Sequence, residues 1–327
     1  MDSDGAEPLS LAENQIWRLP RQRVIVRIAR EGQSAAAARE VRVARWLARE
    51  NVPAVRLVDV EQPVEADGRP VTFWAELPPQ QHGSVEDVAE LLARLHSLTT
   101  PAIELGYLDP FVRVGERLHT ATTIRDDDKQ WLNALHSDLL AAWAERPAGL
   151  PDRAVHGDAW PGNIVRMAGG VLTMDLERFS VGPPEWDLVS TAVRAKTTGA
   201  VSARGYDRFC AVYGYDVTAW EGYPVLAHAR ELRMVTYAAQ HAADNAEWRS
   251  QAQYRIDCLR GRSGLRPWSW KGNPLKSDCP LSHLVGRLSR LEQRRLYALP
   301  PSLRGSRYAA KSNSAAVSPQ ERRCPTG

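Results

Sequence analysis

The chain has 327 residues, of which 43% are hydrophobic and 25% are charged, and its formal net charge is +3. This length is enough for one large core or two lobes, and the composition is typical of a globular protein. No apolar run approaches the roughly 20 residues that a membrane-spanning helix requires. The four cysteines form no CxxC pair, and the acidic first residues do not resemble a secretory signal. We therefore expect a cytoplasmic protein with no membrane partner.

The net charge is unevenly distributed along the chain. Residues 276–327 contain 10 Lys or Arg and 3 Asp or Glu, a charge of +7, which leaves −4 for residues 1–275. A basic tail can bind nucleic acid. Because this tail has neither zinc-finger spacing nor the glycine-aromatic pattern of an RNA-binding motif, a solvated and disordered extension is favoured and a nucleic-acid partner is unlikely. No feature of the sequence predicts a protein partner.

Residues 1–77 have the pattern of a small, sheet-based lobe that carries one helix. We expect strands at 17–19 and 24–29, a helix over 34–50, and further strands at 55–60 and 71–76. The stretch from Leu9 to Asn14 is too short for a complete first strand and phosphate-binding loop, and no glycine lies between Gly5 and Gly32. This lobe is therefore expected to have a truncated start.

Residues 78–275 are expected to form a second, mainly helical lobe. Apolar residues recur at helical spacing over 85–98, and similar patterns cover 131–143 and 231–243. The one clear strand region of this lobe spans 154–176. Beyond it, residues 276–327 form the basic tail, in which only a short amphipathic helix over 281–291 is expected.

The strand region predicts a β-hairpin. Two apolar runs flank Gly169 and Gly170, a dipeptide typical of a two-residue hairpin turn. Counting outward from this turn pairs Ile164 with Asp175. An amide and a carboxylate, those of Asn163 and Asp175, therefore fall at the same open end of the hairpin.

A second carboxylate, that of Asp158, is expected near this open end. It precedes Asn163 by five residues, and Pro161-Gly162 predicts a turn that brings it back. Carboxylate and amide oxygens suit Mg²⁺, whereas the His and Cys ligands that zinc prefers are missing. In phosphoryl transfer two such groups hold metal against the nucleotide phosphates, and one carboxylate accepts the proton of the attacking hydroxyl. Asn163 and Asp175 are placed for the first role and Asp158 for the second.

The small lobe contains a charged pair that supports this interpretation. Strand alternation places Arg27 among apolar neighbours, and helical spacing places Glu40 in an apolar row with Val43 and Leu47. Either charge would be costly to bury alone, so the two are expected to pair. The alternative is two solvated charges on amphipathic elements.

One short segment resembles a known family: it reads His156-Gly157-Asp158-x4-Asn163 and is followed by Asp175. It is similar to the catalytic and metal-binding segments of the aminoglycoside phosphotransferase family, whose members are distant relatives of protein kinases. The resemblance extends over 14–273. It includes a hinge-like strand at 71–74, the segment 91–96 and the segment 182–188, but not the tail. It implies an α+β, bilobal, protein-kinase-like fold, with ATP and Mg²⁺ as cofactors.

The resemblance also implies roles for single residues. Asp158 is the implied catalytic base, and Asn163 and Asp175 are the implied metal ligands. Asp187 would accept backbone N–H groups of the catalytic loop, which His156 would support from below. Within the small lobe, Arg27 and Glu40 stand where a Lys–Glu pair directs a cation to the nucleotide phosphates. The nucleotide would also contact Phe73, Trp74 and Ala75 on the hinge-like strand.

The implied activity is transfer of the ATP γ-phosphate to a hydroxyl of a small molecule, with an aminoglycoside-like antibiotic or an amino sugar among the candidates. The family also includes sugar, choline-like, homoserine and macrolide kinases, so the acceptor stays open. Two departures from the family pattern, Arg27 in place of Lys and the missing glycine-rich loop, leave a catalytically weak or inactive nucleotide-binding protein as the alternative.

Several other residues are candidates for this site or have structural explanations. Glu177 follows Asp175 by two residues, so on a strand its side chain would point the same way as that of Asp175. It would then either assist in binding metal or substrate or have a purely structural role. Trp160 lies next to Asp158 in the chain and is a candidate for the wall of a substrate cleft. His96 and His136 are expected to be packed or surface groups.

Overall fold

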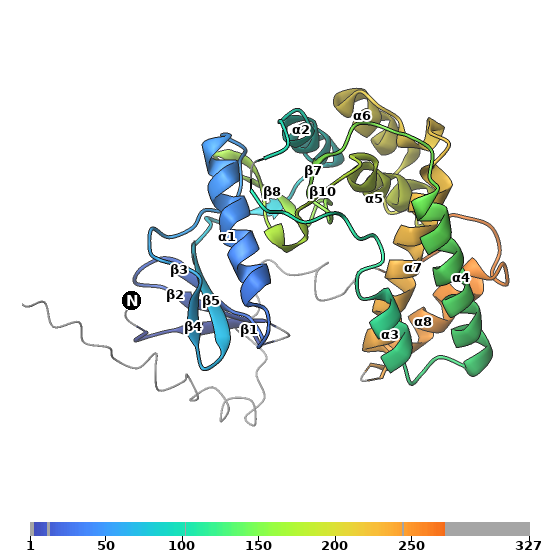
Figure 1. Ribbon diagram of the computed structural model, residues 1–327, viewed down its shortest axis with the longest axis horizontal. Helices are drawn as coiled ribbons and strands as arrows, with labels where there is room; N and C mark the ends of the chain where they lie inside the picture. The colour runs from blue at the N-terminus through green and yellow to red at the C-terminus, as the bar shows by residue number, and fades with distance from the viewer. Residues whose placement is uncertain (1–2, 12–13, 102, 244, 272–327) are drawn as a thin grey trace, which may run out of the picture.

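A sheet-based lobe and a mainly helical lobe lie side by side along the long axis of the molecule (Figure 1). The computed structural model describes residues 3–11, 14–101, 103–243 and 245–271. The basic tail and the helix expected over 281–291 lie outside these residues. The arrangement confirms the predicted α+β class.

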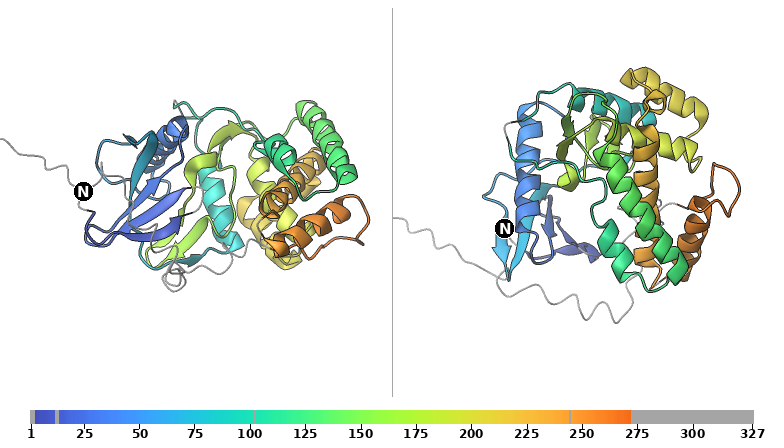
Figure 2. Two further views of the ribbon diagram at one scale, coloured as in Figure 1. Left: turned by 90° about the horizontal axis from the view of Figure 1, so that it is seen from below. Right: turned by 45° about the vertical axis from the view of Figure 1, so that its right-hand side comes forward.

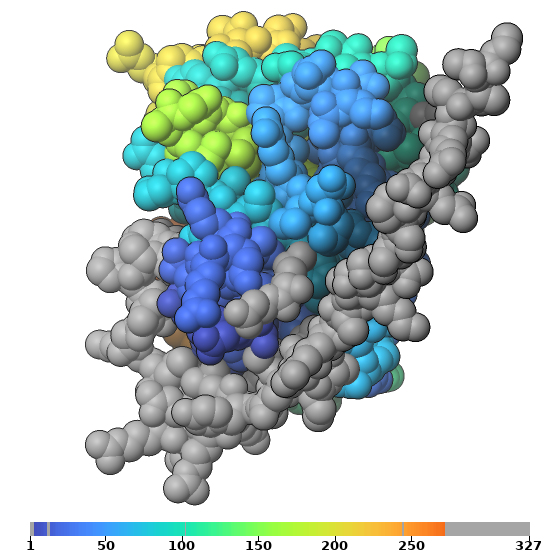
Figure 3. Space-filling model, turned by 90° about the vertical axis from the view of Figure 1, so that its left-hand side faces the viewer, coloured from blue at the N-terminus to red at the C-terminus, as the bar shows by residue number. Residues whose placement is uncertain are grey.

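The first lobe is a five-stranded antiparallel sheet with the strand order β1-β2-β3-β5-β4. Its strands are β1 (Glu7–Leu11), β2 (Gln15–Leu19), β3 (Val24–Ile28), β4 (Val64–Ala66) and β5 (Arg69–Ala75). Alternate residues of β2 and β3, among them Trp17 and Val26, are buried in a small core of their own. In Figure 3 the dark-blue residues of the first strands lie together on the face that is turned to the viewer.

Two expectations for this sheet were wrong. A first strand is present although the sequence before Gln15 was expected to be too short for one, because β1 pairs with β2 up to Leu11 opposite Gln15. The segment 55–60 is not a strand but forms only an isolated bridge, from Leu57 to Trp74. The strand lies instead at β4, where Asp67 and Gly68 both adopt positive φ and close a tight hairpin between Ala66 and Arg69. The Asp67-Gly68 turn predicts this hairpin better than the β-branched residues of 55–60 predict a strand.

The single helix of the small lobe, α1 (Ser34–Arg49), packs into the second lobe as well as against the sheet. Its buried Val43, Trp46 and Leu47 belong to one hydrophobic cluster with Leu92 and Ile164 of the second lobe. The two lobes are thus joined through a shared core rather than by a linker alone.

The second lobe contains most of the helices. Its helices are α2 (Val85–His96), α3 (Val114–Thr120), α4 (Asp126–Ala144), α5 (Glu185–Lys196), α6 (Ala203–Tyr213), α7 (Tyr223–His241) and α8 (Ala246–Leu259). Both views in Figure 2 place α4, α7 and α8 on the side away from the blue sheet. Leu132, Trp186 and Leu232 lie in the core that these helices enclose. Among the residues that the structure describes, no helix is long and apolar enough to cross a membrane.

Five short strands in the second lobe carry the loops of interest. They are β6 (Gln81–His82), β7 (Arg153–Val155), β8 (Ile164–Met167), β9 (Gly170–Thr173) and β10 (Ser180–Gly182). The predicted hairpin is present as β8 and β9, but its register differs by two residues, since Ile164 pairs with Thr173 rather than with Asp175. Because side chains alternate with a period of two, this shift leaves every side chain on its expected face.

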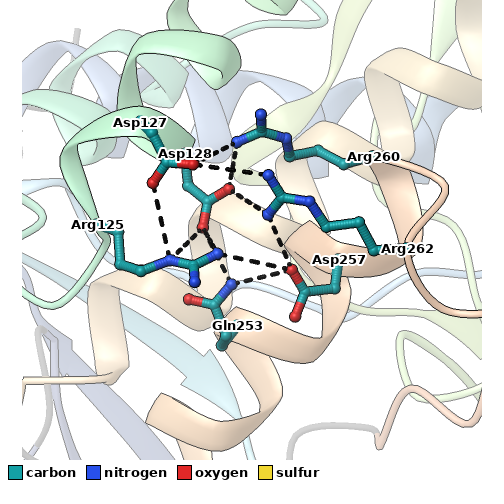
Figure 4. A network of polar contacts seen from close by, with 7 residues as sticks. All are labelled: Arg125, Asp127, Asp128, Gln253, Asp257, Arg260 and Arg262. Carbon is teal, nitrogen blue, oxygen red and sulfur yellow. Dashed lines mark hydrogen bonds and ion pairs between the residues drawn. The ribbon is translucent and has the colours of Figure 1, made fainter.

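A buried carboxylate ties the start of α4 to the end of α8. Figure 4 shows the network, which consists of Arg125, Asp127, Asp128, Gln253, Asp257, Arg260 and Arg262. The Asp128 side chain is fully buried, and it accepts from Arg125 Nη2 at 2.6 Å and from Arg262 Nη1 at 3.0 Å. Burial raises the pKa of Asp128, but hydrogen bonds from Gln253 and the arginines outweigh it and hold that pKa far below its ordinary value.

Asp128→Asn should lower the free energy of unfolding by about 2 kcal/mol at pH 7, less than for a fully enclosed pair because the arginines are partly exposed. Because the pKa of Asp128 is lower in the folded protein than in the unfolded protein, its ionised carboxylate stabilises the fold above about pH 4, the unfolded-state pKa. This stabilisation is lost as the pH falls below that value toward the folded-state pKa. Urea titrations should therefore show the difference from wild type shrinking between pH 7 and pH 3. Asp127→Asn, at an exposed neighbour in the same network, is the control. An unchanged difference at pH 3 would contradict the assignment.

Candidate functional site

The loop that carries Asp158 leaves β7 and is held in place from behind. Gly157 has φ +82°, and a Cβ atom there would lie 2.6 Å from the carbonyl oxygen of Arg178. Only glycine satisfies both the left-handed backbone and the close approach. The backbone conformation thus explains why glycine is the central residue of His156-Gly157-Asp158.

Asp187, near the start of α5, holds this loop. Its buried carboxylate accepts from the backbone N–H of His156 at 2.7 Å and of Gly157 at 2.8 Å. His96 Nε2 lies 3.2 Å from the same carboxylate and connects it to α2. Burial raises the pKa of Asp187, but the hydrogen bond and charge of His96 and the contribution of His156 are larger together, so the pKa lies below its ordinary value. The implied contact of Asp187 with the loop is present, whereas the part that His96 plays in it was missed.

The His156 ring is buried beneath the loop. Its Nε2 lies 3.0 Å from the carbonyl oxygen of Met174, and its ring packs at 5.1 Å from that of Phe179. The backbone N–H of Asp158 reaches Nδ1 of the same ring at 3.3 Å. His156 therefore joins the Asp158 loop to the strand that leads to Asp175, as expected for a supporting residue.

Asp158 and Asn163 lie together, as the sequence predicts. Asn163 Nδ2 donates to the carbonyl oxygen of Asp158 at 2.9 Å and lies 3.3 Å from its Oδ2. Asn163 is buried, whereas the side chain of Asp158 is one-third exposed. On the other side, Arg230 Nη1 of α7 lies 3.6 Å from Asp158 Oδ1. The carboxylate is therefore positioned by groups on both sides but still open to a ligand.

Asp175 lies in an acidic cluster with two other carboxylates. Ligand oxygens of Glu40, Asp175 and Glu177 lie within 4.8 Å of one another. Asp175 adopts a left-handed backbone with φ 57°, immediately before the 3-10 helix η1 (Leu176–Arg178). Glu177 is thus brought in by η1 and not by a strand, so the alternation on which its orientation was predicted does not apply.

Arg27 connects this cluster to the small lobe. Its Nη1 lies 2.6 Å from Glu40 Oε1 and its Nη2 lies 2.9 Å from Glu177 Oε2, which confirms the predicted contact with Glu40. Burial, together with the charges of Asp175 and Glu177, raises the pKa of Glu40 to about 7 against the opposing effect of Arg27. A cleft lined by Arg27, Glu40, Glu177 and Thr72 opens beside the pair.

The chemistry of the cluster fits a divalent cation. Arg27 pairs with Glu40 and Glu177, and Arg178 pairs with Glu177, so three carboxylates meet two guanidinium groups here. Hard oxygen donors of this kind suit Mg²⁺, which keeps its remaining positions for water and phosphate oxygens. The two predicted metal ligands lie in different surroundings: Asp175 is in the acidic cluster with Glu40 and Glu177, while the side chain of Asn163 contacts Asp158.

The residues of the hinge-like strand lie at the end of β5 and not in the acidic cluster. Phe73, Trp74 and Ala75 pair with β3. The backbone N–H of Phe73 donates to Gln62 Oε1 at 2.8 Å, and that of Ala75 to the carbonyl oxygen of Arg56 at 2.8 Å. These two N–H groups are therefore already bonded within the lobe, and contact with a nucleotide would have to come from other atoms of this strand.

Comparison with protein families gives one match. The sequence matches the phosphotransferase enzyme family over residues 6–227, which includes the loop with Asp158, the acidic cluster and Arg27. No curated protein matches the sequence significantly.

Several solved structures have the same fold. The amicoumacin kinase hAmiN, solved with AMP-PNP, Ca²⁺ and Ami, has a TM-score of 0.62 at 12% identity, covering 83% of this chain and 92% of its own. A choline/ethanolamine kinase family protein from Mesorhizobium loti has a TM-score of 0.53 at 19% identity (85% and 92%). The aminoglycoside phosphotransferase APH(3'')-Id from Streptomyces rimosus has a TM-score of 0.52 at 17% identity (70% and 92%). These likenesses confirm the predicted kinase-like fold.

Proposed function

The chain belongs to the phosphotransferase enzyme family, which confirms the predicted resemblance, and we propose that it transfers the γ-phosphate of ATP to a hydroxyl group of a small molecule with the help of Mg²⁺. The observation that carries this proposal is the pairing of Asp158 with Asn163 on a loop that Asp187 braces. The acidic cluster of Glu40, Asp175 and Glu177 supports it.

In the proposed reaction Asp158 is the general base. Its exposed carboxylate accepts the proton of the acceptor hydroxyl as that oxygen forms a bond to the γ-phosphorus. The bond from the γ-phosphorus to the bridging oxygen breaks, and ADP leaves with the bonding electrons. Asn163 keeps the Asp158 carboxylate oriented through its Nδ2 contact.

The acidic cluster and Arg27 would hold the nucleotide phosphates. Asp175 is the proposed metal ligand, with Asn163 as the second predicted ligand and Glu40 or Glu177 as further oxygen donors. When bound, Mg²⁺ would offset the negative charge of the phosphates. The hAmiN structure contains AMP-PNP and Ca²⁺, which supports use of a nucleotide and a divalent cation. Arg27, fixed by Glu40 and Glu177, would present its guanidinium to phosphate oxygens, and Phe73, Trp74 and Ala75 would border the base.

The acceptor is proposed only as a small polar molecule with a hydroxyl group. An aminoglycoside-like antibiotic or an amino sugar remains a candidate from the family, and streptomycin in a complex of APH(3'')-Id is consistent with it. A second function, nucleotide binding with little or no turnover, is favoured by one observation. No glycine stands between β1 and β2, where a flexible loop would cover the phosphates.

The test is phosphate transfer from γ-labelled ATP to a panel of sugars, amino sugars, amino alcohols and hydroxy acids, with and without Mg²⁺. Labelled product that depends on both the acceptor and Mg²⁺ is the expected result. ATP binding without transfer to any acceptor would favour the second function, and absence of nucleotide binding would exclude both.

A further inference from the structure

Three arginines that no part of the proposed mechanism uses surround Asp158. Arg230 and Arg233 lie on α7, and Arg194 lies near the end of α5. Arg230 is only 6% exposed, and its Nη1 lies 3.6 Å from Asp158 Oδ1. The charge of Asp158 is also felt by Arg194 and Arg233, whose pKa it raises against the larger, lowering effect of burial. Arg230 is therefore a direct neighbour of the proposed base, and the charges of Arg194 and Arg233 interact with it.

Tryptophan rings hold these guanidinium groups in place. Arg230 and Arg233 lie over the ring of Trp186, 4.3 and 5.4 Å from its centroid, and Arg194 lies 5.2 Å from that of Trp160. Such stacking orients a guanidinium and leaves its edge available for hydrogen bonds. Trp160 is the residue that the sequence marked as a candidate wall of the substrate cleft.

Protein carboxylates neutralise this cluster only in part, through Asp158 and the charge of Asp187 on Arg230. Within the described part of the chain, neither Arg194 nor Arg233 has an acidic group within 4.0 Å, and Asp158 is the one carboxylate that close to Arg230. The buried Nε atoms of Arg194 and Arg230 also have no hydrogen-bond partner among the described residues. A buried cation without a counter-ion is costly, and an unsatisfied buried donor adds to that cost.

The charges that most affect the pKa of Arg233 are mainly cationic. Apart from Asp158, its largest electrostatic influences are other arginines, namely Arg230, Arg178 and Arg117. Arg178 is already paired with Glu177, on the side of the acidic cluster. The surroundings of Asp158 thus include guanidinium groups on the α5–α7 side, whereas the carboxylates of Glu40, Asp175 and Glu177 gather where the metal and nucleotide are proposed.

We propose that the α5–α7 side binds the acceptor and that this acceptor is an anion, a small alcohol that carries a carboxylate or phosphate group which Arg194, Arg230 and Arg233 bind. This inference rests on the proposed function and narrows it. Guanidinium groups form charge-assisted, often bidentate hydrogen bonds with such oxyanions, whereas a polycationic amino sugar would be repelled by them. The bound anion would satisfy the free Nε donors and bring its hydroxyl next to Asp158.

The first test compares four pyranoses that differ in charge: glucuronate, glucose 6-phosphate, glucose and glucosamine. Their binding to the full chain, with a non-hydrolysable ATP analogue and Mg²⁺ present, is measured by ligand-observed NMR. We expect at least one of the two anions to bind about tenfold more tightly than glucose, and glucosamine to bind most weakly, because charge-assisted hydrogen bonds discriminate by about this amount. Which anion binds better distinguishes a carboxylate from a phosphate site.

Variants separate an acceptor site from other roles of the arginines. Arg233→Gln and Arg194→Gln should each weaken anion binding about tenfold, with ATP affinity unchanged, while Arg233→Lys should recover part of the loss because it keeps the charge. Arg204→Gln, at an exposed position of α6, is the matched control and should change neither. Circular dichroism would show whether each variant is folded.

Three results would overturn the inference. The first is binding of glucosamine that is as tight as that of the anions or tighter, and the second is no binding of either anion. The third is a loss of ATP affinity instead of anion affinity in the arginine variants, which would show that these arginines bind the transferred phosphate. None of them depends on turnover. A turnover result separates the two proposals: transfer of phosphate to neutral or cationic acceptors but not to anions would also disprove the anionic acceptor and leave the proposed function intact. Anion binding without transfer to any acceptor would contradict the proposed function and leave only an anion-binding site.

Discussion

Replacing Asp158 by asparagine should lower kcat for phosphate transfer by about 10³-fold, which lies within the range for removal of a general base. The amide has nearly the same shape and can still meet Asn163 and Arg230, but it cannot accept the hydroxyl proton. ATP affinity should change little, because Asp158 lies outside the acidic cluster of Glu40, Asp175 and Glu177. Steady-state kinetics with the best acceptor of the panel and calorimetric titration with an ATP analogue measure the two quantities.

The matched control is Asp152→Asn, because Asp152 lies on the same segment before β7 but is exposed. It should leave kcat and ATP affinity close to wild type. Loss of less than tenfold in kcat for Asp158→Asn would assign the proton to another group. A parallel loss in ATP affinity would instead indicate that Asp158 holds the nucleotide.

Asp187→Asn should lower the free energy of unfolding by about 3–5 kcal/mol, the amount expected when one partner of a buried charged network is changed. The substitution removes the charge that His96 faces and replaces one acceptor of the loop N–H groups with a donor. Because these N–H groups fix the backbone around Gly157, kcat should fall as well. Urea unfolding at pH 7 measures the stability, and Asp138→Asn on exposed α4 surface is the control.

The pH dependence of this loss has a definite sign. The pKa of Asp187 in the fold lies below its ordinary value, so the charge stabilises the protein above the unfolded-state pKa of about 4 and ceases to do so as the pH falls below it. The difference between wild type and Asp187→Asn should therefore be largest near pH 7 and smallest near pH 3. If the variant does not fold, His96→Gln, which keeps a polar side chain at the same place, tests the network. A loss of stability that does not vary with pH would show that packing, not charge, is the cause.

Local signals in the sequence predicted much of the site. Asp158, Asn163 and the hairpin were found because their order along one short segment leaves few possible arrangements, and the Arg27–Glu40 pair was found because two buried charges need partners. The hairpin register was wrong by two residues because the glycine that adopts a positive φ is Gly170, which pairs with Met167 beyond the turn.

The features that were missed depend on contacts between distant segments. His96 meets Asp187 across 91 residues, and Arg230 meets Asp158 across 72, so neither contact follows from spacing along the chain. Glu177 was weighed on the assumption of a strand, which the left-handed backbone of Asp175 interrupts. Arg233 follows Arg230 by three residues on α7, so the two arginines share a face of that helix, and this spacing was the local signal of the cationic side.

The shared core of α1 has a consequence for the modularity of the protein. Val43, Trp46 and Leu47 are nearly inaccessible to solvent because residues of the second lobe, among them Leu92 and Ile164, cover them. A fragment cut at residue 77 would present this apolar row to water, and the remainder would have a groove of the same shape. The sheet-based lobe and the helical lobe are thus not two independently folding units, so exchanging lobes between related proteins would require a redesign of the face of α1.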